Sequence, residues 1–512
     1  MSTIMKKLFI YTAAVLSALV MTTSCAKLFE DINRPGGKTN DEEMNRDGWA
    51  LMSQIQALEN QAFPEQENTY QMNVDLIGNY CARYMTHTQP KWTTNFVRMN
   101  APEGWLSYPY RDCLPKVSTA MRELGLRVEK DNPFYCWAQI IHASVMLRLT
   151  DTYGPFPIAD DGSYASQKEV YYFLLDNLDH ATGILGPMVQ ADPSLTMGVP
   201  AKDLVYAGKM AQWVRYANSL KLRIAVRMRF ADPAKAQAVA EAAVQSGVIT
   251  ANEDNCTIGF MPNGQYKTSV EWGDSRACAD IESYLTGYND PRLTLYFKPT
   301  ATAGPRAVIG CPASASIGDN PTAKGLYSAA NVESSTRGVW MTAAEMFFCR
   351  AEGALAGWSM GGSAKELYED GIRASFAQWG ASGADIYLAD ATSLQANYVN
   401  ADGGYGRSAY PRVSTITIAW AEGDSDERKL ERIITQKWLA LFPCGDEGWN
   451  EIRRTGYPQV FTLSPASVTG AQIPNRVPFD PKEAVNNREN YQAAVQLLGG
   501  ADDYLTKMWW QR

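Results

Sequence analysis

The chain has 512 residues, 20% of them charged and 46% hydrophobic, an ordinary globular composition that excludes a disordered chain, a collagen-like fibre and a disulfide-dense miniprotein. The 47 Lys and Arg residues against 55 Asp and Glu residues give a formal net charge of −8. Because an acidic chain without a basic block repels phosphate backbones, nucleic acid is excluded as a partner.

The first residues have the order of an export signal. Two lysines precede an apolar run over 8–21 that is too short to span a bilayer, and small residues then lead into Cys25. This order is similar to a bacterial lipobox, in which the cysteine becomes the acylated first residue. We expect a lipoprotein signal peptide over 1–24, a palmitate-type lipid anchor on Cys25 and a polar tether over 25–40. The alternative is an ordinary signal peptide with a cysteine nearby.

Helical hairpins are predicted over about 41–247. Apolar residues recur there at helical spacing, first at Trp49, Met52, Ile55 and Leu58 and next at Val74, Ile77, Cys81 and Tyr84. Ser166 and Glu169 form a capping box ahead of a further helix. Asp232 followed by a proline starts the last helix of this region, and Gly247 ends it.

The composition changes over about 248–340. Gly, Pro, Asn and Ser become frequent, and the helical periodicity is lost, most clearly over 299–331. A stretch of this length is too long to be a mere connector, and such loops usually carry function. We therefore expect a loop-rich ligand region here.

Helices resume over about 341–380. Capping boxes at Thr342/Glu345 and Ser363/Glu366 start two helices that carry small residues where they must approach closely. A hairpin of about 34 residues with this pattern is typical of a tetratricopeptide unit. The sequence therefore predicts a mainly α fold, in which a tetratricopeptide-like α-α superhelix packs against the loop-rich region.

Motifs for catalysis and metal binding are missing from the sequence. The three histidines, His87, His142 and His180, are separated by dozens of residues and have no metal-ligand spacing. The sequence contains no nucleophile elbow and no phosphate-binding loop. The acidic run over 424–427 lacks the glycine and the distal Glu of a calcium loop and is explained by helix capping. We expect a binding protein rather than an enzyme, with no cofactor and no metal.

Aromatic residues are concentrated over 84–110. Six of these 27 residues are aromatic, about 22% against 11% for the whole chain, and they lack helical periodicity. Aromatic faces stack on the apolar faces of sugars or side chains, while neighbouring polar groups fix orientation. We therefore predict ligand contacts from Trp92, Phe96, Trp105, Tyr108, Asn95 and Arg98, with Trp272, Tyr327 and Trp340 as weaker candidates. The alternative is that these aromatic residues pack the superhelix against the C-terminal half.

Eight cysteines remain after Cys25, scattered along the chain without a CxxC pair. An exported protein could pair them, and buried free thiols are equally compatible with the sequence. Both states stay open.

Several strings allow a comparison with a known family. They are DTYGPFP at 151–157, NDPR at 289–292, TAAE at 342–345, IITQKWLALF at 433–442, EGWNEIRRTGYP at 447–458 and RVPF at 476–479. Through them the chain resembles the SusD/RagB family of outer-membrane nutrient-binding lipoproteins, particularly its starch-binding-associated branch. We interpret the strings as structural, with Arg453 and Arg454 binding carboxylates or carbonyls between the helical half and the rest.

The resemblance implies one SusD-like domain over 41–512, in which 381–512 is the C-terminal region. It also implies ligand loops near 87–110 and 260–340. The implied function is capture of an oligomeric nutrient, most simply a glycan, by a lipid-anchored protein on the outer face of the outer membrane. The implied partner is a SusC-like TonB-dependent β-barrel transporter, over which the lipoprotein closes as a hinged lid. An oligopeptide cargo and a tetratricopeptide-type adaptor are the alternatives.

Overall fold

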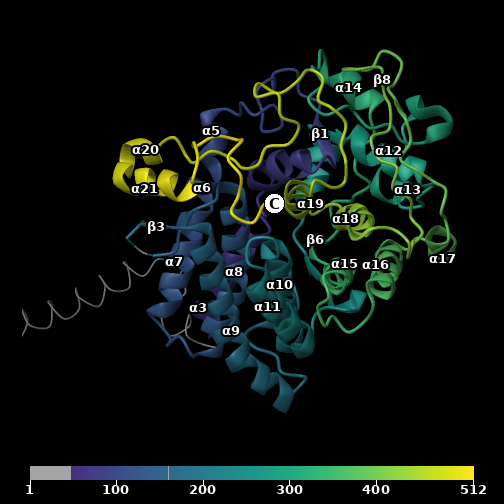
Figure 1. Ribbon diagram of the computed structural model, residues 1–512. Helices are drawn as coiled ribbons and strands as arrows, with labels where there is room; N and C mark the ends of the chain where they lie inside the picture. The colour runs from purple at the N-terminus through teal and green to yellow at the C-terminus, as the bar shows by residue number, and fades with distance from the viewer. Residues whose placement is uncertain (1–47, 160) are drawn as a thin grey trace, which may run out of the picture. The chain divides into compact units, whose positions relative to one another are not determined.

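The computed structural model describes residues 48–159 and 161–512 (Figure 1). The predicted signal peptide over 1–24, the lipidated Cys25 and the tether over 25–40 lie outside the described residues. Their roles, and the boundaries drawn between them, therefore stay predictions.

The chain divides into two units, Met1–Ala50 and Leu51–Arg512, and the second unit contains the fold described below. Within the described part of the chain, no helix is both long and apolar enough to cross a membrane. Most of its helices are amphipathic or are buried inside this unit.

Neighbouring helices pack in pairs. The pairs are α8 (Pro133–Tyr153) with α9 (Gln167–Ala191), α10 (Met210–Met228) with α11 (Pro233–Ser246), and α15 (Ala343–Leu355) with α16 (Ala364–Trp379). α3 (Trp49–Ala62) precedes them in the chain, and α7 (Leu114–Gly125) packs on α8. Because α10 also contacts α9 and α15, the pairs stack on one another (Figure 1). The predicted mainly α, tetratricopeptide-like fold is confirmed.

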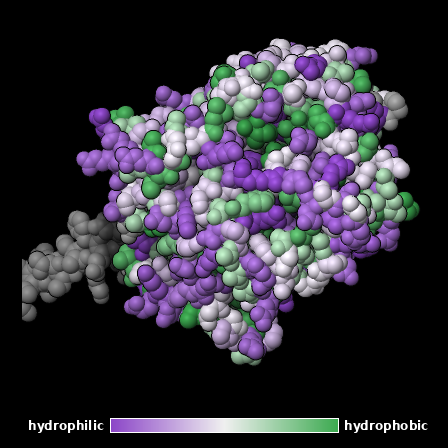
Figure 2. Space-filling view, viewed as in Figure 1, coloured by the Kyte–Doolittle hydropathy of each residue, from purple (hydrophilic) through white to green (hydrophobic). Residues whose placement is uncertain are grey.

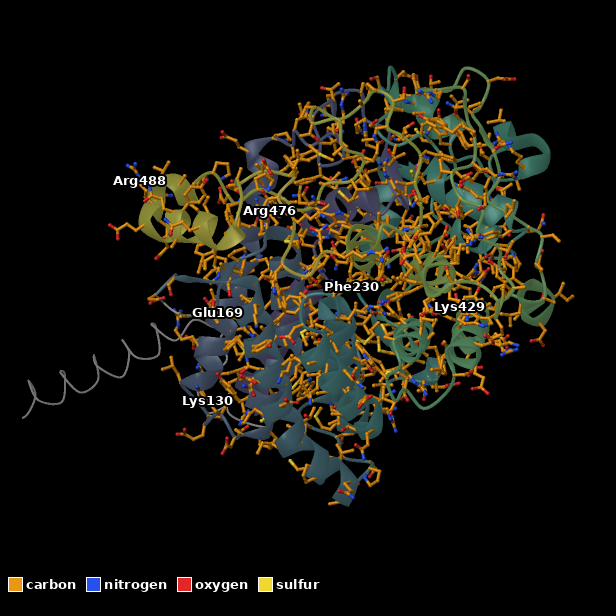
Figure 3. The ribbon with its side chains drawn as sticks, in the orientation of Figure 1. Lys130, Glu169, Phe230, Lys429, Arg476 and Arg488 are labelled. Atoms are coloured by element: carbon orange, nitrogen blue, oxygen red, sulfur yellow. The ribbon has the colours of Figure 1, made fainter. Side chains whose placement is uncertain are left out.

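Local capping explains where these helices begin. The Glu169 backbone N–H donates to Ser166 Oγ at 3.3 Å, and the Ser166 N–H donates to the Glu169 carboxylate at 2.8 Å, so the predicted capping box forms at the start of α9. Glu169 is labelled in Figure 3. The box at Ser363 and Glu366 forms in the same way before α16. At Thr342 the side chain caps the helix, which is the first half of the predicted box.

The region over 71–79 differs from the sequence prediction in helix type. The predicted apolar stripe is buried, but η2 (Gln71–Asn79) is a π-helix, which sequence periodicity does not distinguish from an α-helix over nine residues. Gly78 lies against α19 (Gly445–Thr455), since a Cβ at this position would be 2.5 Å from the backbone nitrogen of Asp446. The close approach therefore requires glycine.

The loop-rich region contains more regular structure than the sequence indicates. Its strands form two-stranded antiparallel pairs, β4 (Cys256–Ile258) with β6 (Gly338–Met341), and β5 (Ser275–Ala277) with the earlier β1 (Met85–His87). Its helices are η4 (Asn252–Asp254), η5 (Tyr266–Glu271), α12 (Ala279–Gly287), α13 (Leu293–Tyr296), η6 (Ala301–Arg306) and α14 (Asn320–Leu326). Helices of three to nine residues make too few turns to give a periodic apolar stripe.

Further short elements connect these parts. They are α4 (Glu67–Tyr70), α5 (Glu103–Leu106), α6 (Tyr108–Asp112), η3 (Pro200–Lys202) and α17 (Ala384–Leu388), with the strand pairs β2 (Phe156–Pro157) and β3 (Tyr164–Ala165), and β7 (Tyr398–Val399) and β8 (Ala409–Tyr410). The last helices are α18 (Asp426–Leu441), α19, α20 (Glu483–Asn486) and α21 (Arg488–Leu498). α18 packs on α15 and α19, so the family-like strings of the C-terminal third contact the helical hairpins directly.

A buried network of charges joins α15, α18 and α19. Arg454 is fully buried and donates to both carboxylate oxygens of Glu352, at 2.6 and 2.7 Å, and to Glu451 at 2.6 Å. Lys437 donates to the other oxygen of Glu451 at 2.8 Å. Arg454 therefore binds carboxylates between the helical hairpins and the C-terminal region, as the sequence interpretation proposed.

Arg453 has an equally structural position. Its guanidinium lies 3.6 Å from the ring centre of Trp449 and donates to the backbone carbonyls of Asp151 and Asn475. The indole of Trp510, close to the C-terminal end of the chain, donates to Asp151 Oδ1 at 3.1 Å and is completely buried. Trp510 is thus built into the core, although Arg512, two residues later, is exposed.

The eight cysteines that follow Cys25 are all free, and seven of them are buried. Burial raises the pKa of Cys81 and of Cys349 to about 12, because a thiolate is poorly solvated there. The structure therefore favours packed thiols over disulfides among these residues.

Candidate functional site

Four rings form a contiguous row at the predicted ligand loop. The centre of the Trp92 ring lies 6.3 Å from that of His87 and 5.5 Å from that of Trp105, which it meets edge to face. Trp105 in turn lies 5.8 Å from Phe96. We call His87, Trp92, Trp105 and Phe96 the aromatic row. Trp92 and Trp105 are partly exposed, whereas Phe96 and His87 are buried beneath the surface.

Contacts from the distant loop region hold the aromatic row in place. β1 pairs with β5 in the register His87 to Ser275. Beyond the pair, Thr88 donates from its backbone to the Asp274 carbonyl at 2.9 Å, and Asn320 at the start of α14 donates to the Thr88 hydroxyl at 2.9 Å. The loop over 87–110 and the region over 260–340, the two ranges in which the family resemblance implies ligand loops, are therefore joined by β-pairing and hydrogen bonds. In Figure 2 apolar residues gather over the part of this face where β1 lies in Figure 1.

The row is electrically neutral. Burial lowers the pKa of His87 to about 4, since the imidazolium would lose its hydration, so the ring is uncharged at neutral pH. Its Nδ1 lies 3.2 Å from the Gln89 carbonyl oxygen. Uncharged rings with exposed faces suit the apolar faces of a neutral ligand.

The two polar candidates of the loop are Asn95 and Arg98, and the Asn95 side chain makes hydrogen bonds to the loop backbone. Asn95 is buried, its amide nitrogen donates to the Trp92 carbonyl at 3.0 Å, and its amide oxygen accepts from the Arg98 N–H at 2.9 Å. The Asn95 side chain therefore positions Trp92 from behind. Arg98 is half-buried, and its buried Nε has no hydrogen-bond partner.

Tyr108 and Trp272 keep exposed ring surface outside the row. The Tyr108 hydroxyl accepts from Asn68 Nδ2 at 3.2 Å, and the Arg111 guanidinium lies 4.9 Å from its ring centre. The Lys267 ammonium lies 5.5 Å from the ring centre of Trp272. Both rings are therefore accessible and flanked by cations.

Tyr327 and Trp340 lie in the core. Tyr327 is 1% exposed and donates to Asn400 Oδ1 at 3.1 Å, while Trp340 is 7% exposed and donates from Nε1 to Ser144 Oγ at 3.0 Å. Like Phe96 and Asn95, these side chains have almost no surface at the outside of the molecule, although Trp340 lines an internal cavity described below. The accessible candidates are therefore Trp92, Trp105, Tyr108, Trp272 and the half-buried Arg98, and their part in binding stays a prediction.

Two hollows adjoin one another elsewhere in this unit, and residues of the predicted ligand region over 248–340, Trp340 among them, line part of their walls. One is a cavity of about 100 Å³ with walls from α4, α8, the segment over 331–340 and the start of α19, and the other is an open cleft of about 740 Å³ beside η3, β4 and the end of α16. Thr336, Arg337, Val339 and Trp379 line both. No group of three or more His, Cys, Asp or Glu side chains suited to a metal occurs among the described residues.

Comparisons with known proteins agree with this fold. The structure defines the class of this protein. It is a helical protein in which tetratricopeptide-like helix pairs carry a loop-rich half, and aromatic rings are exposed on the loops. The family model described as "SusD-like: Susd and RagB outer membrane lipoprotein" matches residues 31–511. The chain belongs to the SusD/RagB family of outer-membrane lipoproteins. The predicted assignment is confirmed, while the branch within the family stays a prediction.

Solved structures of the family cover nearly the whole chain. A SusD homologue from Bacteroides uniformis is 35% identical with a TM-score of 0.85, and the match covers 91% of this chain and 99% of that one. A homologue from Bacteroides thetaiotaomicron is 33% identical with a TM-score of 0.84, over 90% and 99%. A chitin-binding SusD homologue from Flavobacterium johnsoniae is 33% identical with a TM-score of 0.84, over 90% and 98%. No curated protein matches the chain.

Proposed function

We propose that this lipoprotein captures an oligosaccharide at the cell surface and delivers it to a TonB-dependent β-barrel transporter. The observation that carries the proposal is the pair of partly exposed rings, Trp92 and Trp105, 5.5 Å apart on a loop that two separate segments hold in place. Membership of a family of outer-membrane lipoproteins supports it. The chitin-binding relative from Flavobacterium johnsoniae favours a glycan over an oligopeptide as cargo.

The site acts by binding alone. The indole faces stack on sugar rings, and because the loop is already ordered by Asn95 and by β1, little conformational entropy is lost on binding. We propose no catalytic role for any side chain here. The protein captures its cargo, closes over the mouth of the barrel as a hinged lid and releases the cargo inward.

The decisive experiment is a titration of the full chain with oligosaccharides by calorimetry, after mass spectrometry of material that co-purifies with it has named the cargo. We expect Trp92→Ala and Trp105→Ala each to weaken binding by about thirtyfold, roughly 2 kcal/mol, as for a hot-spot aromatic residue. Trp420→Ala is the matched control, since Trp420 is also partly exposed but lies outside the row. Normal affinity in both row variants together with a much lower melting temperature would assign the rings to packing.

Anchoring and partnership are tested separately. We expect Cys25→Ala to leave the protein unprocessed or free of the membrane, because the acyl chains are its proposed attachment. Wild-type protein extracted in mild detergent should co-purify with a larger β-barrel protein. Repeated isolation of the chain without a partner from native membranes would contradict the proposal that it acts as a lid on a transporter. If only peptides co-purify with it, the cargo is an oligopeptide.

A further inference from the structure

The Asp274 carboxylate joins two glutamine side chains from distant parts of the chain. Its Oδ2 accepts from Gln71 Nε2 of η2 at 2.9 Å, and its Oδ1 accepts from Gln89 Nε2 in the loop of the aromatic row. Asp274 is half-buried, and among the described residues no Lys, Arg or His forms an ion pair with it. Both of its oxygens are therefore used to bind neutral amides, in charge-assisted hydrogen bonds.

A tight turn presents Asp274 to this loop. Gly273, just before it, has a φ of +70°, a left-handed conformation that favours glycine, and the Asp274 N–H donates to the Thr268 carbonyl at 2.8 Å. The carbonyl of Gly273 accepts from the Thr88 hydroxyl at 2.6 Å. β5 begins at the next residue and pairs with β1. The turn is thus ordered by its own bonds and by the sheet, and it holds the carboxylate in a fixed place.

Gln89 connects the carboxylate to the aromatic row. Its carbonyl oxygen lies 3.2 Å from His87 Nδ1 and accepts from the Trp92 backbone N–H, also at 3.2 Å. Both distances are at the long end of the range for such bonds. Since Asn95 binds the Trp92 carbonyl, Gln89 and Asn95 hold the two sides of the Trp92 backbone. The position of the Trp92 ring therefore depends on where Gln89 is held.

We propose that Asp274 is a positioning residue of the glycan site. By holding Gln89 it fixes the turn over 89–92, and with it the Trp92 ring, in the conformation that stacks on a sugar. The inference rests on the proposed glycan function, because it concerns the same aromatic row. A turn that is ordered before the sugar arrives avoids the entropy loss of ordering a mobile loop. A turn ordered only part of the time would raise the apparent Kd in inverse proportion to the ordered fraction.

Four variants separate positioning from a general effect on stability. Gln89→Met and Gln71→Met each remove one amide donor to the same carboxylate at nearly constant shape, but only Gln89 lies in the loop of the aromatic row. Gln71→Met is therefore the matched control. Asp274→Ala removes the support and leaves Gln89 itself in place, so it separates positioning from a direct contact between Gln89 and a sugar. Asp274→Asn can still hydrogen-bond Gln89 and should behave much like wild type.

Hydrogen exchange of the full chain without any ligand tests the order of the turn. We expect the Trp92 amide, which donates to the Gln89 carbonyl, to exchange about tenfold faster in Gln89→Met and in Asp274→Ala, because the charge-assisted bond to the loop is lost. The rate should be unchanged in Gln71→Met. Unchanged exchange in Gln89→Met, or an equal increase in Gln71→Met, overturns the inference whatever the protein binds.

Calorimetry tests the effect on binding. The probe is the β-1,4-linked N-acetylglucosamine tetramer, a chitin fragment, because one relative of the chain binds chitin. We expect Gln89→Met and Asp274→Ala each to weaken its binding by about fivefold, as when the turn is ordered about a fifth of the time, and Gln71→Met to leave it unchanged. Faster exchange with unchanged affinity overturns the positioning role. If wild type binds neither this tetramer nor any other oligosaccharide, the proposed function is overturned instead, and the exchange rates still decide whether Asp274 orders the turn.

Discussion

Replacing Arg454 by methionine tests whether the charge network joins the helical hairpins to the C-terminal region. The change removes a fully buried guanidinium with three short contacts to Glu352 and Glu451. Breaking a buried ion pair by removing one partner typically costs 3–5 kcal/mol, because the remaining charge is left without compensation.

The structure places the expected cost at the lower end of this range. Glu352 retains Arg229 at 3.2 Å, and Glu451 retains Lys437 at 2.8 Å, so each carboxylate keeps one cation. We therefore expect Arg454→Met to lower the free energy of unfolding by about 3 kcal/mol. A second change, Glu352→Gln in the Arg454→Met background, should restore part of the loss, because it removes one of the two buried carboxylates that lose Arg454 as a partner.

Urea unfolding followed by circular dichroism measures both effects. The control is Arg127→Met, which removes a partly exposed pair with Glu123 at 2.8 Å and should cost no more than about 0.5 kcal/mol. If Arg454→Met loses less than about 1 kcal/mol and cannot be distinguished from Arg127→Met, the network does not hold the two parts together.

Three further outcomes follow from single residues. Burial raises the pKa of Glu282 to about 7, so its ionisation destabilises the fold as pH rises from about 4.5 through 7. In urea unfolding at pH 8, Glu282→Gln should therefore raise the free energy of unfolding by up to about 3 kcal/mol relative to wild type, whereas at pH 4 the two proteins should be equally stable. An equal effect at both pH values would refute the charge argument. Gly78→Ala should lower the free energy of unfolding by about 1–3 kcal/mol, because the new Cβ would lie 2.5 Å from a backbone nitrogen of α19. The control is Gly183→Ala on an open face of α9, which should leave stability unchanged or increase it. Trp510→Phe should cost about 1 kcal/mol in thermal unfolding through the lost bond to Asp151, and an unchanged melting temperature would show that this bond is dispensable.

The helical hairpins could be predicted from the sequence because their signals are local. A capping box such as Ser166 with Glu169 and a helix start such as Asp232 before proline act within one turn of chain, and the structure shows both. The type of η2 could not be predicted in this way. Its π geometry comes with its packing on α19, far away in the sequence, and an apolar stripe of four residues fits both helix types.

Whether an aromatic candidate is exposed or buried depends on residues far away in the sequence, and a local sequence pattern does not reveal them. Trp340 is buried because its indole donates to Ser144, 196 residues earlier, and Tyr327 because it donates to Asn400, 73 residues later. Trp92 keeps exposed surface because its contacts are short-range ones within its own loop, apart from the support of β1. A count of aromatic residues in the sequence therefore finds a loop that carries exposed rings but does not separate surface rings from core rings.

The cavity was beyond sequence reasoning for the same reason. Gln265, Trp379 and Asp446 come from three separate elements, and each is unremarkable in its local sequence. Only the fold brings these residues to the wall of one cavity.

The size of the aromatic row limits how much affinity it can supply alone. Truncating either exposed ring is expected to cost about 2 kcal/mol, and because such costs do not simply add, two rings supply at most about 4 kcal/mol, a Kd no tighter than about 1 mM. Binding with a Kd of this size permits release into a transporter, but it leaves most of the protein unoccupied when the cargo concentration is far below the Kd. Capture at the cell surface therefore requires further contacts, either from the barrel when the lid closes or from a second subsite on the same chain.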